Sequence, residues 1–170
     1  MNFAHVLIFL AQIYYSSSTP FNQKSESSCL SELTKCKIPA GFRVTRGIGA
    51  YRYFDTPKNW NIARKSCTNF GAHLAVIKSK KEEDDVRSIL NGKQVKDAWI
   101  GYHNHFAHNE WVSIMDESLE RIGYKNWGKE EPNNANGNQH CVKSTPLGWD
   151  DYDCSEALPF FCKVDLNCQL

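Results

Sequence analysis

The chain has 170 residues and a formal net charge of +1, with 20 lysines and arginines against 19 acidic residues. A chain this close to neutrality offers no electrostatic basis for binding nucleic acid or an acidic membrane surface. We therefore expect neither as a partner. The length that remains after a leader is enough for one domain with a hydrophobic core.

The first residues have the pattern of a secretory signal peptide. Residues 3–15 (FAHVLIFLAQIYY) form an apolar run that three small serines follow. Such a run is too short to span a membrane as a helix, and it suits the apolar region of a signal peptide better than a buried core helix. We predict a signal peptide over residues 1–18, an N-terminal extension over 19–35 and one domain over 36–170. The protein is expected to be secreted and extracellular, with no membrane anchor.

The first predicted elements of the domain are a hairpin and a helix. β-branched and aromatic residues broken by two glycines indicate the hairpin over residues 41–54. Thr56 and Pro57 then indicate the first turn of a helix that Gly71 ends. Its buried face is predicted from four residues spaced three, four and three apart: Trp60, Ala63, Cys67 and Phe70.

A second helix is predicted after a short apolar strand over residues 74–77. Ser79 and Glu82 have the spacing of a capping box, and the helix is predicted to end at Asn91-Gly92. Its core-facing residues are predicted to be Val86, Ile89 and Leu90. The acidic run Glu82–Asp85 lies near the helix N-terminus, where negative charge suits the macrodipole, and we interpret it as a solvated face.

The second half of the chain is predicted to be mostly loop between two buried strands. The first strand covers residues 98–102, and the closing strand, 160–164, returns beside the first strand of the domain. Three residues are predicted to lie in the core: Trp99, Ile100 and Trp111. Short strands are expected near 110–113, 141–143 and 149–152. A loop region of this length in a compact domain is usually functional.

The densest polar stretch lies inside this region, from Glu131 to Cys154 (EPNNANGNQHCVKSTPLGWDDYDC). A hard cation such as Ca²⁺ takes about six to eight oxygen ligands from flexible carboxylates and amide carbonyls. The candidates here are three carboxylates and two amides: Glu131, Asp150, Asp151, Asn133 and Gln139. Pro132 is a candidate for a cis peptide bond. The alternative is a polar surface loop in which Asn, Gly and Pro serve only as turn residues.

Four features of the sequence resemble the C-type lectin-like domain. They are Glu131-Pro132-Asn133, a cysteine ten residues after Glu131, Trp149-Asp150-Asp151 before a further cysteine, and Trp99-Ile100-Gly101. The chain is similar to soluble, secreted invertebrate members of that family. The resemblance implies an α+β fold with two helices, small antiparallel sheets and a long calcium- and sugar-binding loop. It identifies residues 36–170 as the C-type lectin domain.

Seven cysteines in a secreted chain of this size favour disulfides over a zinc–thiolate site. The resemblance implies two bridges, Cys67–Cys162 and Cys141–Cys154. The remaining cysteines are Cys29, Cys36 and Cys168. Either Cys29–Cys36 or Cys36–Cys168 leaves one thiol over, and we favour Cys36–Cys168. The odd cysteine predicts an intermolecular bridge and hence a disulfide-linked homodimer.

The resemblance also implies one Ca²⁺ site. Its implied ligands are Glu131, Asn133, Gln139, Asp150 and Asp151, of which the first four would also hydrogen-bond sugar hydroxyls. The Glu-Pro-Asn run implies mannose, GlcNAc or fucose rather than galactose. Two positions depart from the family pattern, because Gln139 stands where Glu is usual and Asp150 where Asn is usual. The number of carboxylates therefore stays at three.

Two further metal hypotheses are disfavoured. The positions that align with an auxiliary calcium site carry no carboxylate: Asn104, His108, Asn134 and His140. Loop histidines suggest zinc, but they lack a thiolate or carboxylate framework: His103, His105, His108 and His140. A single calcium is the expected cofactor.

The resulting prediction is a secreted, calcium-dependent lectin that recognises foreign or microbial glycans in innate immunity. The alternative is a calcium-independent protein-binding module of the same fold, for which Gln139 and Asp150 are the evidence. An enzyme is not expected, because the acids cluster rather than flank a cleft. No nucleophile–base signature such as GxSxG occurs in the sequence.

Overall fold

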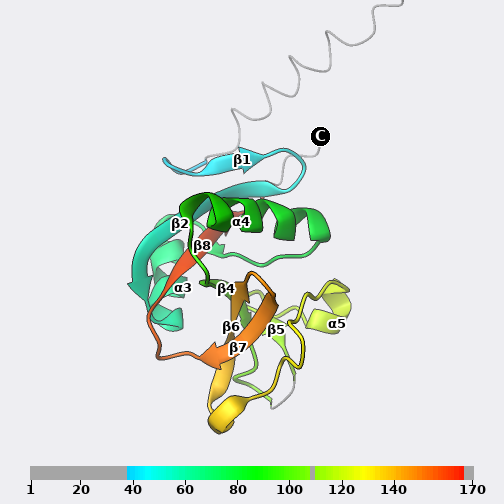
Figure 1. Cartoon of the computed structure of the whole chain (residues 1–170). Coiled ribbons are helices and arrows are strands. Elements are labelled where there is room, and N and C mark those ends of the chain that lie inside the picture. The colour runs from blue at the N-terminus through cyan, green and yellow to red at the C-terminus, as the bar shows by residue number, and fades with distance from the viewer. Residues whose placement is uncertain (1–37, 108–109, 167–170) are drawn as a thin grey trace, which may run out of the picture. The chain divides into compact units, whose positions relative to one another are not determined.

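The computed structural model of the protein describes residues 38–107 and 110–166. Its elements in chain order are β1 (Arg43–Thr45), β2 (Gly49–Lys58), α3 (Trp60–Asn69), β3 (His73–Leu74), α4 (Lys80–Lys93), β4 (Ala98–His103), β5 (Val112–Ser113), α5 (Leu119–Ile122), the 3-10 turn η1 (Ala135–Gly137), β6 (Gln139–Thr145), β7 (Gly148–Asp153) and β8 (Leu158–Val164). Figure 1 shows β1, β2 and α4 towards one end of the domain, and β6, β7 and α5 towards the other. The predicted α+β class is confirmed.

The described strands form one sheet rather than several small ones. Their order is β1-β2-β8-β4-β6-β7, with β3 paired to β8 and β5 paired to β4. The contact that joins the two halves is the parallel pair β4–β8, where Trp99 lies opposite Phe160. The closing strand β8 lies beside β2, as predicted, and the two strands pair antiparallel. The short helix α5, which Gly123 ends at a φ of 73°, was not predicted.

The hairpin is confirmed, but the predicted start of the first helix is wrong. Thr56 and Pro57 lie in β2, and α3 begins at Trp60 with the Asn59 side chain accepting a hydrogen bond from the backbone of Ile62 at 2.9 Å. The register of β2 against β8 shifts between Phe54 and Lys58. Proline, which lacks an N–H, is tolerated in a strand at such an irregularity.

The predicted buried face of α3 is correct for three of its four residues. Trp60, Ala63 and Cys67 are buried, whereas Phe70 follows the helix as its cap and is 38% exposed. The helix ends at Asn69, and the backbone N–H of Gly71 donates to the carbonyl of Thr68.

The cap of α4 is confirmed, but its end and its acidic face are corrected. Ser79 accepts from the backbone of Glu82, yet the helix continues past Asn91-Gly92 and is closed by Gln94 in the left-handed region. Glu82 and Glu83 are buried rather than solvated. Glu83 accepts a hydrogen bond from the Trp149 indole at 2.7 Å, so the first turn of α4 faces the core.

The core is built on the residues that the sequence singled out. Trp99 and Ile100 are fully buried and Trp111 is nearly so, which confirms the prediction. Trp149, at the start of β7, stacks on Tyr102 with ring centroids 5.0 Å apart. The packing of Trp149 fixes the part of β7 that carries the next two residues, Asp150 and Asp151.

Two disulfides lie within the described residues, and they are the pairs that the resemblance implies. Cys67–Cys162 ties α3 to β8, and Cys141–Cys154 ties β6 to the residue after β7. The predicted signal peptide, the N-terminal extension, the three other cysteines and the Cys36–Cys168 bridge lie outside the described residues. Over residues 38–107 and 110–166, no helix combines the length and the apolar character that crossing a membrane requires.

Candidate calcium and sugar site

The site is assembled from β6, β7 and the loop that precedes β6. The antiparallel register of these strands places Val142 opposite Asp151 and Lys143 opposite Asp150. The loop contributes Glu131 and Asn133 on either side of Pro132, and the Glu131–Pro132 bond is cis, as predicted. Loop and strand residues that are seventeen to twenty positions apart in the sequence therefore meet at one place.

Asp151 fixes the loop to the sheet. Its side chain is fully buried, and its two oxygens accept hydrogen bonds from the backbone N–H groups of Asn133 at 2.9 Å and Asn134 at 2.8 Å. Hydrogen bonds to a carboxylate are stronger than those between neutral groups. The carboxylate of Asp151 is therefore held rigidly in a fixed orientation.

The predicted amide ligands already take part in hydrogen bonds of the loop itself. Asn133 donates from its side-chain nitrogen to Glu131 Oε1 at 2.9 Å, which sets a donor directly beside an acceptor. The backbone N–H of Ala135 donates to the side-chain oxygens of both Asn133 and Gln139. These contacts bring Gln139 to the loop that carries Glu131 and Asn133.

Glu131, Asp150 and Asp151 form what we call the carboxylate cluster. One oxygen from each lies within 4.8 Å of the others. Among the described residues, Glu131 Oε2 is buried with no hydrogen-bond partner. Burial, together with the neighbouring charges of Asp150 and Asp151, raises the pKa of Glu131 from its ordinary value of 4.5 to about 7. Converging carboxylates and an unpaired buried oxygen fit a hard divalent cation.

The structure adds a residue that the sequence reasoning missed. Lys143 Nζ lies 3.2 Å from Asp150 Oδ2 and 3.4 Å from Asp97 Oδ2. Burial lowers the pKa of Lys143, but the charges of Asp97 and Asp150 outweigh it, and the pKa is raised overall. The only signal in the sequence was a lysine two residues after Cys141, which has no meaning until the strand register is known.

The positions aligned with an auxiliary calcium site are used within the fold. His140 Nδ1 hydrogen-bonds Asn104 Oδ1 at 2.9 Å, and Asn134 accepts from the backbone of Gln139. His108 lies outside the described residues. These contacts neither add a carboxylate to these positions nor test the number of calcium ions, so a single calcium remains a prediction.

His103 and His105 line an open pocket of about 480 Å³, together with residues that include Trp60 and Phe106. Burial lowers the pKa of His103 to about 4, and it also lowers the pKa of His105. His105 Nε2 lies 3.6 and 3.7 Å from the sulfurs of the Cys141–Cys154 disulfide, which are not thiolates. This geometry supplies no thiolate partner for a zinc site.

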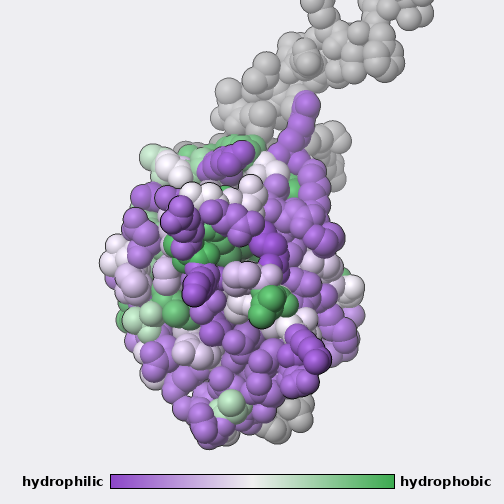
Figure 2. All heavy atoms as spheres, in the orientation of Figure 1, coloured by the Kyte–Doolittle hydropathy of each residue, from purple (hydrophilic) through white to green (hydrophobic). Residues whose placement is uncertain are grey.

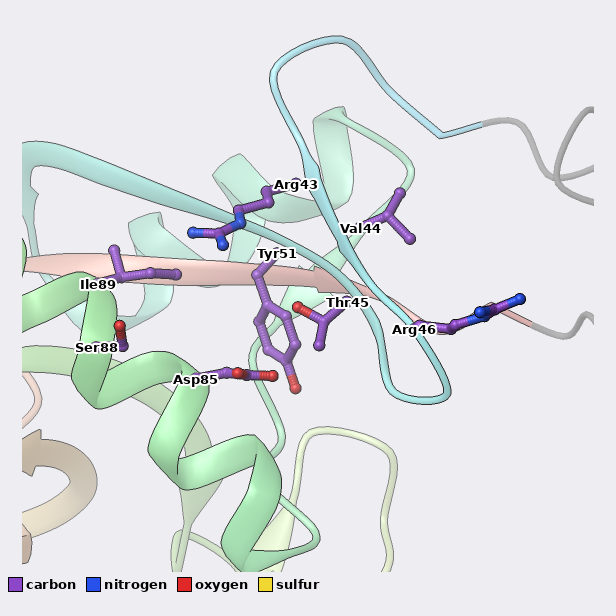
Figure 3. A pocket seen from close by; sticks show the side chains of 8 residues that line it. All are labelled: Arg43, Val44, Thr45, Arg46, Tyr51, Asp85, Ser88 and Ile89. Atoms are coloured by element: carbon purple, nitrogen blue, oxygen red, sulfur yellow. The ribbon is translucent and has the colours of Figure 1, made fainter. Parts of the chain in front are cut away.

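A smaller pocket of about 220 Å³ lies between the β1–β2 hairpin and α4 (Figure 3). The ring of Tyr51 extends into it beside Asp85 and Thr45. Among the described residues, Tyr51 Oη and Asp85 Oδ2 are buried without a hydrogen-bond partner. Buried polar groups of this kind are often bridged by an internal water.

Comparison with known proteins places the chain in a family. A family model described as the Lectin C-type domain matches residues 56–164. The match covers α3, the long loop, the carboxylate cluster and both disulfides. The chain belongs to the C-type lectin domain family. This is a family of lectins rather than of enzymes, which supports a non-enzymatic protein at the family level.

Similar proteins show how far the likeness extends. A hemolymph lipopolysaccharide-binding protein of Periplaneta americana is 33% identical over 76% of this chain, and the chain spans 54% of that protein. A C-type lectin mannose-binding isoform of Oxyuranus scutellatus is 32% identical over 79% of this chain and 87% of its own length. A calcium-independent type II antifreeze protein of known structure is 25% identical, with a TM-score of 0.65 over 75% of this chain and 93% of that chain.

Proposed function

We propose that the protein is a secreted, calcium-dependent lectin that binds mannose-type sugars through the carboxylate cluster and the amides beside it. One observation carries the proposal: three carboxylates converge while one buried oxygen of Glu131 stays unpaired within the described residues. An unpaired buried oxygen costs free energy unless a partner arrives. A bound cation is the partner that the chemistry of this donor set favours.

The residues that would hold calcium are Glu131, Asn133, Gln139, Asp150 and Asp151. The ion, when bound, would supply coordination for two neighbouring sugar hydroxyls. Of the protein groups, the carboxylates of Glu131 and Asp150 accept hydrogen bonds, and the amides of Asn133 and Gln139 donate them. Donor and acceptor already lie side by side at Asn133 and Glu131. Such alternation suits a pair of hydroxyls, each of which both donates and accepts.

The preference for mannose, GlcNAc or fucose rests on Glu131-Pro132-Asn133, and the name of the snake relative supports it. The name of the cockroach relative supports recognition of foreign glycans, over the half of that protein that the chain spans. The apolar N-terminal run, and a relative named for hemolymph, support secretion.

The proposal is tested by titrating Ca²⁺ while thermal unfolding is followed. A ligand at one hundred times its Kd stabilises the folded state by about 2.7 kcal/mol, which raises Tm by about 5 °C or more in a domain of this size. The rise should vanish in the double variant Glu131→Ala with Asp151→Ala. It should persist in a control that removes two exposed acids, Glu110→Ala with Glu120→Ala. Mannose should then compete better than galactose for the calcium-loaded protein.

A second candidate is a calcium-independent protein-binding module. The observation that favours it is the ion pair between Lys143 and Asp150, which supplies a positive charge to the carboxylate cluster without any metal. The antifreeze protein shows that this fold also serves a calcium-independent protein. The face drawn in Figure 2 is mostly hydrophilic, with hydrophobic residues in separate groups rather than one broad patch. A Tm that calcium leaves unchanged would favour this candidate.

A further inference from the structure

Lys143 is built into the fold beside the carboxylate cluster. It lies on β6 directly opposite Asp150 on β7, and only 8% of the residue is exposed. Its ammonium group contacts Asp97 and Asp150, and it lies 3.7 Å from the centre of the Tyr152 ring. Two carboxylates and an aromatic face therefore hold the charge in place. A surface lysine that meets an acid by chance is not held in this way.

The ammonium group of Lys143 and a calcium ion would compete for the carboxylate of Asp150. Both bind its carboxylate through electrostatic attraction, and a positive charge beside the cluster opposes the approach of another. The same charge offsets part of the repulsion among three carboxylates that share one place. Lys143 therefore acts in opposite directions on the calcium-free and the calcium-bound protein.

We propose that Lys143 is a built-in counter-cation that holds Asp150 when calcium is absent and lowers the calcium affinity of the carboxylate cluster. This inference rests on the proposed function, because it concerns the same site. It explains how Asp150 can stand where the family usually has Asn. The negative charge of Asp150 is offset by Lys143 on the neighbouring strand β6.

The test is the substitution Lys143→Met, which keeps an unbranched apolar chain and removes the charge. Without calcium, Tm should fall, because three carboxylates then repel one another without a counter-cation. Calcium should bind about tenfold more tightly or better, as measured by calorimetry. The gain in Tm on adding calcium should grow accordingly. A lysine that merely packs β6 against β7 would lower Tm equally with and without calcium.

A matched control comes from the second buried lysine of the fold. Lys163 is also held by two carboxylates, those of Glu82 and Asp165, and neither belongs to the carboxylate cluster. Lys163→Met should lower Tm by the same amount with and without calcium, and it should leave the Kd for calcium unchanged. If Lys143→Met does not fold, Lys143→Gln keeps a donor for Asp97 and is expected to show the same tighter binding.

The double variant Lys143→Met with Asp150→Asn closes the cycle. Removing both charges together should restore the part of the calcium-free Tm that Lys143→Met loses through Asp150, because an amide at that position needs no counter-cation. The part that is lost through Asp97 should remain. No restoration would mean that Lys143 acts through packing rather than through Asp150.

The outcomes separate this inference from the proposed function. If the unchanged protein and Lys143→Met bind calcium equally well, the inference is overturned and the calcium-dependent lectin stands. If only Lys143→Met binds calcium, the inference is upheld and the calcium dependence of the natural protein is refuted. If neither folded protein binds calcium, both are refuted.

Discussion

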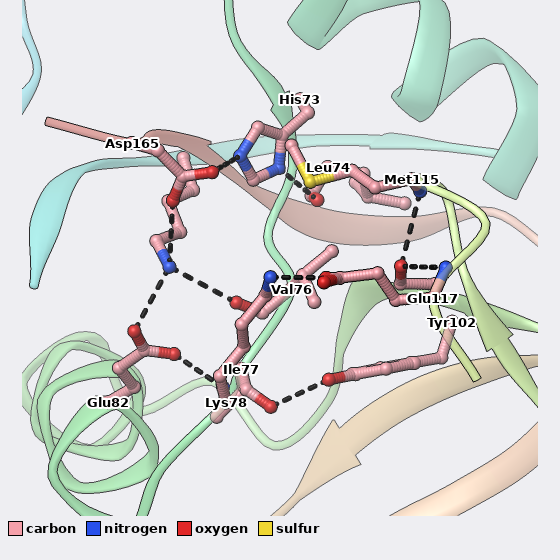
Figure 4. A network of polar contacts seen from close by, with 12 residues as sticks. His73, Leu74, Val76, Ile77, Lys78, Glu82, Tyr102, Met115, Glu117 and Asp165 are labelled. Carbon is pink, nitrogen blue, oxygen red and sulfur yellow. Dashed lines mark hydrogen bonds and ion pairs between the residues drawn. The ribbon is translucent and has the colours of Figure 1, made fainter. Parts of the chain in front are cut away.

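Lys163 and Lys143 are both buried and each contacts two carboxylates, but the balance of charge around them differs. Lys163 on β8 lies 3.0 Å from Glu82 and 3.1 Å from Asp165. Figure 4 shows how further partners complete this network: the ring of His73 reaches Asp165, and the backbone of Lys78 donates to the second oxygen of Glu82. Lys143 on β6 also contacts two carboxylates. The carboxylate cluster beside it, however, has three carboxylates and only this one lysine to offset their charge.

The pKa values of the two regions report this difference. The hydrogen bond from His73, together with Lys163, holds the pKa of Asp165 well below its ordinary range despite burial. Burial and two neighbouring carboxylates instead raise the pKa of Glu131 to about 7. In the network around Lys163, protein groups offset the buried negative charges. The carboxylate cluster keeps an excess of negative charge, which a cation would offset under the proposed function.

The largest expected effect comes from breaking the satisfied network. Lys163→Met leaves Glu82 buried and Asp165 half-buried without their lysine, and losing one partner of a buried pair typically costs about 3–5 kcal/mol. Urea unfolding should show this loss in the free energy of unfolding. Lys143→Met should cost less, because Lys143 is less buried than Lys163 and both of its carboxylates, Asp97 and Asp150, are partly exposed. Equal losses would contradict the distinction between the two regions.

A smaller and opposite effect is expected in the carboxylate cluster. Glu131→Gln removes a charge that its neighbours oppose, so the calcium-free protein should be as stable as the unchanged protein or more stable near pH 7. The stabilisation by calcium, about 2.7 kcal/mol at one hundred times Kd, should largely disappear. Glu130→Gln is the matched control, because Glu130 is the preceding residue and is exposed. A fall in calcium-free stability for Glu131→Gln alone would show that its charge is already compensated.

Local signals in the sequence were sufficient for much of the fold. The Ser79 cap and the buried Trp99-Ile100 strand depend on neighbours in sequence, and they were predicted correctly. Pro57 was misread because its tolerance in β2 depends on an irregular pairing with β8, which only the folded sheet shows. Glu83 was misread because its partner, Trp149, lies 66 residues away.

The candidate site shows the same limit. Its carboxylates and amides could be proposed from composition and resemblance, since their residue types carry the chemistry. Lys143 could not, because its role depends on the register that sets it opposite Asp150. A shift of one residue in that register would point Lys143 to the other face of the sheet. Side chains that act through a cross-strand partner are thus the ones that sequence reasoning misses.

The smallest expected effect is a pH dependence that isolates Glu131. In the calcium-free protein its folded-state pKa is about 7 against an ordinary 4.5, so between these values the folded state holds a proton that the unfolded state releases. The contribution of Glu131 to stability therefore falls as pH rises from about 4.5 to 7. His103 and His105, with lowered pKa values, act in the opposite direction over part of this range.

Both proteins contain His103 and His105, so the contribution of these histidines cancels in the difference in Tm between Glu131→Gln and the unchanged protein. That difference should be greatest at pH 7 and above, and it should shrink towards zero as pH falls below about 4.5, where Glu131 becomes protonated in both states. Asp165 does not disturb the measurement, because its lowered pKa makes its contribution constant above its ordinary range and lost only in stronger acid. A difference independent of pH would mean that Glu131 titrates normally. The carboxylate cluster would then resemble the satisfied network around Lys163, and the case for a cation at Glu131 would lose its electrostatic basis.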